Sequence, residues 1–172
     1  MPDTLRSQRV QAVLDRLFTA AALDDDSRAA WPAGRDYASA TAQERADVMQ
    51  DIYMPVSQPG GCLLYSLVRA SRPDTVIEFG TSFGISTIYL AAAVTDNGAG
   101  RVLTTELSAT KAAAAQANLT EAGVAEPVTI LTGDALTTLA DVAGPIGLVL
   151  LDGWKDMCLP CSGCWRVTEC YD

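Results

Sequence analysis

Residues 75–86 read TVIEFGTSFGIS, a short β-branched apolar run that leads into a glycine-bearing turn. The run predicts a buried strand, and the segment after Gly84 predicts a helix. Such a turn lets backbone approach a ligand, and ligands of open α/β sheets bind outside the carboxyl ends of the strands. The glycine spacing is Gly-x-x-x-Gly, with Glu78 two residues before Gly80. An acidic turn suits a cationic ligand better than a dinucleotide pyrophosphate. A purely structural glycine turn is the alternative.

The alternation of strands and helices continues downstream of this turn. Further apolar runs are RVLTTEL, PVTIL and IGLVLLD, and the alanine-rich segment KAAAAQANLTEAG lies between the first two. The resulting β-α-β-α-β-α-β order predicts a three-layer α/β/α fold with a parallel sheet and right-handed crossovers. Because the strands are continuous apolar runs, we expect helices on both faces of the sheet.

Three helices are predicted upstream of the first strand, over residues 4–22, 41–53 and 61–71. Apolar residues spaced by three and four mark the first, and a Thr-x-x-Glu capping box opens the second. The third carries four apolar side chains on its expected buried side: Leu63, Leu64, Leu67 and Val68. We expect residues 1–53 to form a helical cover and residues 54–156 to form the core of the same domain. Residues 157–172 form an atypical cysteine-rich tail.

The composition narrows the function classes. The chain has 172 residues, 49% of them hydrophobic, and a net charge of −9 from 12 basic and 21 acidic residues. One globular domain is expected, and the acidic balance argues against nucleic acid as a partner. The absence of histidine excludes Ser-His-Asp, Cys-His and HExxH chemistry. With no apolar leader and no run of 18 apolar residues, we expect a cytoplasmic protein without membrane association.

Acidic residues follow the later strands as well. Glu106 ends the second strand, where its carboxylate can accept both hydroxyls of a ribose or remain solvated at a helix entry. Asp134 follows the third strand and can bind an amino group or cap the next helix. Asp152 follows the fourth, with Lys155 nearby, which places both charges at a crevice or in a surface turn. Lysine occurs only at positions 111 and 155. Acidic residues at successive strand ends favour a binding site.

These segments resemble the S-adenosylmethionine-dependent class I O-methyltransferases, in the branch of the catechol and caffeoyl-CoA enzymes. The resemblance covers residues 55–156, and its most specific parts are VIEFGTSFGIS and LLDGWKD. It implies a Rossmann-like methyltransferase core under N-terminal covering helices, with the C-terminal strands missing. The implied activity is methyl transfer to a hydroxyl of a small-molecule acceptor, and a homodimer is a further expectation.

The resemblance also implies a cofactor site. Glu78, Gly80 and Ser86 would contact the methionine end of S-adenosylmethionine, and Val56 would approach it from the entry of the third helix. The complete implied set is Val56, Glu78, Gly80, Ser82, Gly84, Ser86, Glu106, Asp134, Ala135 and Asp152.

The remaining roles follow the same resemblance. Glu106 would hold the ribose, and Asp134 with Ala135 would border the adenine. Asp152 would lie beneath the sulfonium and serve as a ligand of Mg²⁺ in the metal-dependent branch. Lys155 matches the general base, which takes the acceptor's hydroxyl proton if its pKa is depressed.

The tail departs from the family after about Met157. Its four cysteines, three of them spaced Cys-x-x-Cys-x-x-Cys, permit a zinc or iron-sulfur site formed by Cys158, Cys161, Cys164 and Cys170. We favour a shifted and prematurely ended reading frame, which would leave the chain truncated and its activity in question. The competing functions are a cofactor-binding module without catalysis and a metal protein based on the tail. A nicotinamide-dependent oxidoreductase fits the glycine spacing least well.

Overall fold

A parallel sheet lies at the centre of the computed structural model, which describes residues 3–24 and 39–154. Within this part of the chain the sheet has four strands in the order β3-β2-β1-β4. Their bounds are Thr75–Phe79 for β1, Arg101–Glu106 for β2, Val128–Thr132 for β3 and Leu148–Leu151 for β4. The predicted parallel α/β architecture is confirmed.

The register of the sheet brings the strand ends level with one another. Phe79 at the end of β1 pairs with Thr105 of β2 on one side and with Leu151 of β4 on the other. The residues that follow these positions therefore gather at a single edge. Glu106 and Asp152 reach that edge from the two strands that flank β1, as the sequence predicts.

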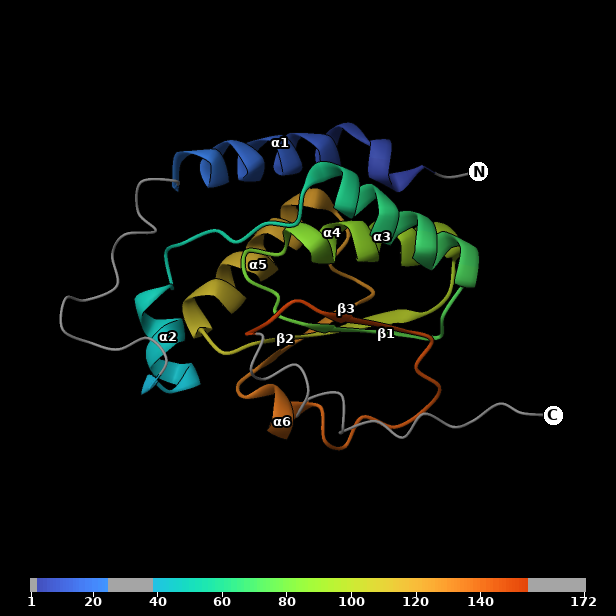
Figure 1. Cartoon of the computed structure of the whole chain (residues 1–172). Helices are drawn as coiled ribbons and strands as arrows, with labels where there is room; N and C mark the ends of the chain where they lie inside the picture. The colour runs from blue at the N-terminus through green and yellow to red at the C-terminus, as the bar shows by residue number, and fades with distance from the viewer. Residues whose placement is uncertain (1–2, 25–38, 155–172) are drawn as a thin grey trace.

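Most helices cover one face of the sheet. Figure 1 shows α1 (Gln8–Leu23), α3 (Gln58–Ser71), α4 (Ile85–Asn97) and α5 (Ala109–Ala122) on one side and the short α6 (Ala135–Thr138) on the other. A 3₁₀ turn, η1 (Thr4–Arg6), precedes α1. The remaining helix, α2 (Ala42–Val48), lies near the carboxyl ends of the strands. No helix within the described residues is long and apolar enough to cross a membrane.

Cover on both faces is complete for β1 but not for β4. Leu148 and Leu150 pack into a core cluster with Val68 of α3. Val149 and Leu151 alternate with them and are 39% and 36% exposed. The expectation of two covered faces is therefore wrong for β4 within the described residues, because α6 is short and β4 lies at the end of the strand order.

The predicted capping box of α2 is present, but the helix is shorter than expected. Thr41 Oγ1 accepts from the Glu44 backbone N–H, and the Glu44 side chain accepts from the Thr41 backbone N–H. The helix ends at Val48 and not near Tyr53. Backbone groups that a longer helix would pair internally bond to side chains instead. The Ile52 carbonyl accepts from Lys111, and the Tyr53 N–H donates to Asp24.

Two details of α3 differ from the prediction. The helix begins at Gln58, three residues early, because Ser57 caps it and a proline in the first turn has no need of a donor. Its buried side holds Gly61 and Val68, whereas Leu63 and Leu67 are 59% and 46% exposed. Gly61 allows the close approach of α4, since a Cβ there would lie 2.4 Å from the Tyr89 ring.

Candidate functional site

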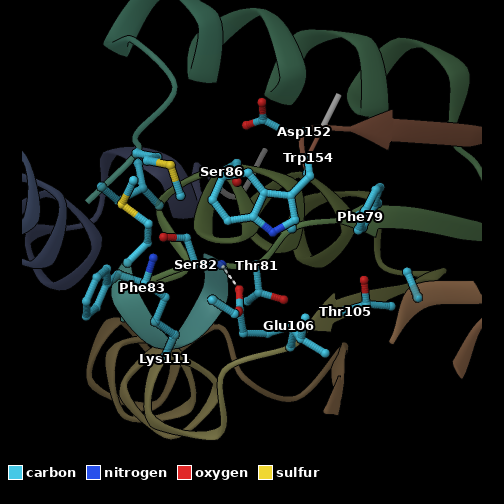
Figure 2. A pocket seen from close by; sticks show the side chains of 18 of the residues that line it. Phe79, Thr81, Ser82, Phe83, Ser86, Thr105, Glu106, Lys111, Asp152 and Trp154 are labelled. Carbon is cyan, nitrogen blue, oxygen red and sulfur yellow. Dashed lines mark hydrogen bonds between the residues drawn. The ribbon is translucent and has the colours of Figure 1, made fainter. Parts of the chain in front are cut away.

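A cavity opens at the carboxyl edge of the sheet and is lined in part by α2 and the segment that joins α2 to α3; Figure 2 shows side chains of its wall. Its wall contains eight of the residues implied by the resemblance: Val56, Gly80, Ser82, Ser86, Glu106, Asp134, Ala135 and Asp152. They come from the α3 entry, the turn after β1, the end of β2, the start of α6 and the end of β4. The fold thus brings together groups that are up to 96 residues apart in the sequence, from Val56 to Asp152.

Two implied residues lie behind this wall, and one lies outside the described residues. Glu78 is fully buried and does not line the cavity. Gly84 has a φ of 85° and begins α4, where a Cβ would lie 3.3 Å from the Ala115 methyl. Its place in the fold is a close helix contact that favours glycine. Lys155 lies outside the described residues, as do all the cysteines of the tail.

Glu106 is the most firmly held charged group of the cavity wall. Its Oε2 accepts the backbone N–H of Ser82 at 2.8 Å, and its Oε1 accepts the backbone N–H of Ser108 at 2.9 Å. A carboxylate has about four lone-pair sites, so each oxygen can accept a further hydrogen bond. The two backbone donors therefore fix the carboxylate in the wall while it still can bind a pair of hydroxyls.

Ser82 is held in an unusual backbone conformation opposite Glu106. Its φ is 49°, in the left-handed region that non-glycine residues rarely adopt. Strained backbone of this kind persists where the surrounding structure requires it, often at binding sites. Here it directs the Ser82 N–H to Glu106. The Ser82 hydroxyl oxygen is buried and has no hydrogen-bond partner in the part of the chain that the structure describes.

Glu78 anchors the turn from below. Its carboxylate accepts hydroxyl donors from Ser86, Thr87 and Thr104, each at 2.6 Å. Burial raises the pKa of Glu78 to about 7, against the lowering effect of the three hydrogen bonds. In this structure Glu78 therefore acts through its neighbours: it positions Ser86, which does line the cavity.

The two aspartates of the wall have different surroundings. Asp134 Oδ1 accepts the Leu136 N–H at 2.9 Å and caps α6, so the capping alternative raised by the sequence is what the structure contains. Asp134 also lines the cavity. The pKa of Asp152 is raised by burial, and Figure 2 shows its side chain near the Trp154 indole.

Sequence reasoning missed the wall formed by Lys111, Tyr53 and Phe83. Lys111 is 3% exposed; its Nζ donates to the Ile52 carbonyl at 2.9 Å and lies 5.4 Å from the centre of the Phe83 ring. Tyr53 stacks on Phe83 with 3.9 Å between ring centres. Burial lowers the pKa of Lys111. The one sequence feature that could have pointed to Lys111 is the scarcity of lysine, because only two occur in the chain.

The parallel sheet, with a cavity at its acidic strand ends, is that of an open α/β protein, and the comparisons with known proteins give its family. A model described as a methyltransferase domain matches residues 77–158. A catechol O-methyltransferase of Mycobacterium tuberculosis is 39% identical over 124 residues, which are 72% of this chain and 56% of that protein. The chain spans about half the length of the curated relatives it matches.

Solved structures agree with this assignment. A cofactor-bound protein from M. tuberculosis is 33% identical, with a TM-score of 0.62 over 86% of this chain and 68% of that chain. An O-methyltransferase of Streptomyces achromogenes in complex with S-adenosylmethionine is 28% identical, with a TM-score of 0.59 over 87% of this chain and 70% of that one. The chain belongs to the S-adenosylmethionine-dependent class I O-methyltransferase family.

Proposed function

We propose that this chain binds S-adenosylmethionine in the strand-end cavity and transfers its methyl group to a hydroxyl of a small acceptor. The observation that supports this most directly is the Glu106 carboxylate, which two backbone N–H groups fix at the cavity wall. Vicinal hydroxyls of a ribose are the natural partners of such a carboxylate. The relatives named as O-methyltransferases support the same activity.

The cavity suits the chemistry of this cofactor. Ser82 and Thr105 line it, and their buried hydroxyl oxygens have no partner among the described residues, so a polar ligand could supply one. We propose that Gly80, Ser82 and Ser86, with Val56, border the methionine end. Glu78 and Gly84 support that end from behind. Asp134 and Ala135, which begin α6, border the adenine.

Catalysis of this reaction depends mainly on positioning the cofactor and the acceptor. S-adenosylmethionine supplies a methyl group on a sulfonium, and in-line displacement by the acceptor oxygen breaks the S–C bond as the O–C bond forms. The protein's task is to hold the two reactants in line and to exclude water, which contributes on the order of 7–11 kcal/mol in favourable cases. Asp152 provides a partly desolvated carboxylate near a cationic ligand. We propose that Lys155 takes the proton released by the acceptor hydroxyl.

A magnesium site is not formed by the described residues alone. Within residues 3–24 and 39–154, no three side chains of the metal-ligating types lie close enough to hold an ion, and Asp152 is the one ligand that the resemblance implies there. No step of the proposed reaction is therefore assigned to a metal. The acceptor remains a small hydroxylated molecule, and the homodimer stays a prediction.

Calorimetric titration of the whole chain with S-adenosylhomocysteine tests the proposal. Saturable binding at one site per chain is expected. A folded, monodisperse protein that shows no heat of binding would contradict the cofactor assignment. Turnover is measured separately, by incubating the protein with S-adenosylmethionine and a panel of phenols and catechols with and without Mg²⁺. Binding without any methylated product would identify a binding module and not an enzyme.

Glu106→Gln is expected to weaken S-adenosylhomocysteine binding by about 1–3 kcal/mol, because it replaces one acceptor oxygen and removes the charge that strengthens the ribose hydrogen bonds. The dissociation constant from calorimetry is the measurement. Glu126→Gln removes an exposed carboxylate elsewhere on the surface and serves as the control. Equal affinities for both variants would remove Glu106 from the proposed site.

A further inference from the structure

Thr105 is a cavity residue to which neither the sequence nor the family resemblance assigns a role. It is the fifth residue of β2, directly before Glu106, and its side chain is 2% exposed. It lines the cavity, and Figure 2 shows it below Phe79 and to the right of Glu106. Its hydroxyl oxygen is buried and has no hydrogen-bond partner among residues 3–24 and 39–154.

The lack of a hydrogen-bond partner sets the Thr105 hydroxyl apart from the buried hydroxyls around it. Thr104 donates to Glu78 and is within 2.6 Å of the Thr81 hydroxyl. Thr87 and Ser86 also donate to Glu78. The buried hydroxyl oxygens that the described residues leave without a partner belong to Ser82 and Thr105, and both residues line the cavity. A buried hydroxyl without a partner destabilises the protein, and a ligand in the cavity that bonds to it can remove that penalty.

The alternation of β2 decides on which face of the sheet the Thr105 side chain lies. Val102 and Thr104 face α4 and the Glu78 cluster, whereas Leu103 packs with Ala135 and Leu139 on the α6 side. Because successive side chains of a strand point to opposite faces, Thr105 lies on the same side as Leu103. That side of the cavity is the one that Asp134 and Ala135 border. The Thr105 side chain is thus placed on the side of the sheet where the proposed adenine position lies.

We propose that the Thr105 hydroxyl makes a direct hydrogen bond to the adenosine part of the bound nucleoside and is a determinant of its affinity. This inference rests on the proposed function, since it takes the cavity ligand to be a nucleoside held by Glu106. A hydroxyl that serves the ligand and not the fold has a distinctive signature. Its removal should weaken binding without lowering the stability of the ligand-free protein.

The test compares three variants of the whole chain by thermal unfolding without ligand and by calorimetric titration with S-adenosylhomocysteine. Thr105→Val keeps the shape and deletes the hydroxyl; its dissociation constant should rise about 3- to 10-fold, while its melting temperature is unchanged or higher. Thr105→Ser keeps a hydroxyl and should retain affinity within about 2-fold. Thr75→Val deletes a buried hydroxyl that does have a partner, Arg101, at the opposite end of β1. It should lose stability and keep its affinity.

Several results would overturn the inference. Equal affinity of Thr105→Val and the unsubstituted protein would remove the hydrogen bond, and so would a loss of affinity that Thr105→Ser does not restore. A lower melting temperature in Thr105→Val, comparable to that of Thr75→Val, would show that the hydroxyl supports the fold. Failure of the unsubstituted protein to bind S-adenosylhomocysteine would instead contradict the proposed function itself, so the two failures are distinguishable.

Discussion

Replacing Glu78 by alanine is expected to lower the free energy of unfolding by about 3–5 kcal/mol. The substitution removes the common acceptor of Ser86, Thr87 and Thr104, all of which are buried. Three hydroxyls lose a partner in a place that water does not reach, and a cavity is left where a large side chain was fully enclosed. Urea unfolding followed by far-ultraviolet circular dichroism gives the change.

Glu78→Gln is the matched control, because it preserves the shape and one acceptor oxygen. The amide needs no counter-charge, so this variant should lie within about 1.5 kcal/mol of the unsubstituted protein at neutral pH. A loss as large as that of the alanine variant would show that the charge, and not the hydrogen-bond acceptor, holds the turn in place. Stability of the alanine variant equal to that of the unsubstituted protein would contradict the anchoring role altogether.

The same carboxyl group predicts a pH dependence with a definite sign. Burial raises the pKa of Glu78 from 4.5 to about 7, so between these values the folded protein holds a proton that the unfolded chain has released. The contribution to stability is complete below about pH 4.5 and is lost as the pH rises through about 7. Relative to Glu78→Gln, the unsubstituted protein should lose about 3 kcal/mol between those limits. An unchanged difference between the two proteins across this range would contradict the raised pKa.

The strand ends could be predicted from the sequence because they depend on local pattern and on one topological rule. Apolar runs of four to six residues locate the strands, and parallel strands must carry their carboxyl ends to the same edge. Glu106 and Asp152 follow from those two facts. The capping box at Thr41 is equally local, since both of its hydrogen bonds lie within four residues.

The errors concern contacts between segments far apart in the chain. The hydroxyl donors to Glu78 were not predicted, because they include Thr104, which is 26 residues away in the chain. Leu63 and Leu67 were placed in the core because they extend an apolar face. The side that actually packs centres on Gly61, whose lack of a side chain admits Tyr89. A small residue opposite an aromatic ring leaves no periodic signal in either segment.

The early end of α2 at Val48 also results from contacts with segments far away in the chain. Nothing in residues 49–53 ends a helix by propensity alone, since neither glycine nor proline occurs there. The chain leaves the helix because Lys111 binds the Ile52 carbonyl and Asp24 binds the Tyr53 N–H. Those contacts place Tyr53 and the following residues against the cavity, so the segment that sequence reasoning described least well is one that shapes the candidate site.

Gly80→Ala is expected to lower both stability and cofactor affinity. Gly80 has a φ of 103°, a conformation that alanine rarely adopts, and an added Cβ would lie 2.9 Å from the Asp152 carbonyl oxygen. Backbone strain and the forced separation of the β1 and β4 ends together should cost about 2–5 kcal/mol of stability. Because Asp152 moves with that strand end, S-adenosylhomocysteine affinity should fall at least about 10-fold, or 1.4 kcal/mol.

Gly98→Ala separates the two causes. Gly98 also has a positive φ, 72°, but a Cβ there would meet nothing within 4 Å. This variant therefore carries a comparable conformational penalty of about 1 kcal/mol without a steric one, at the far end of α4 from the cavity. The difference between the two variants measures the contact between Gly80 and the end of β4. If Gly80→Ala loses no more stability than Gly98→Ala and keeps its affinity, the close approach of these strand ends does not form the floor of the binding site.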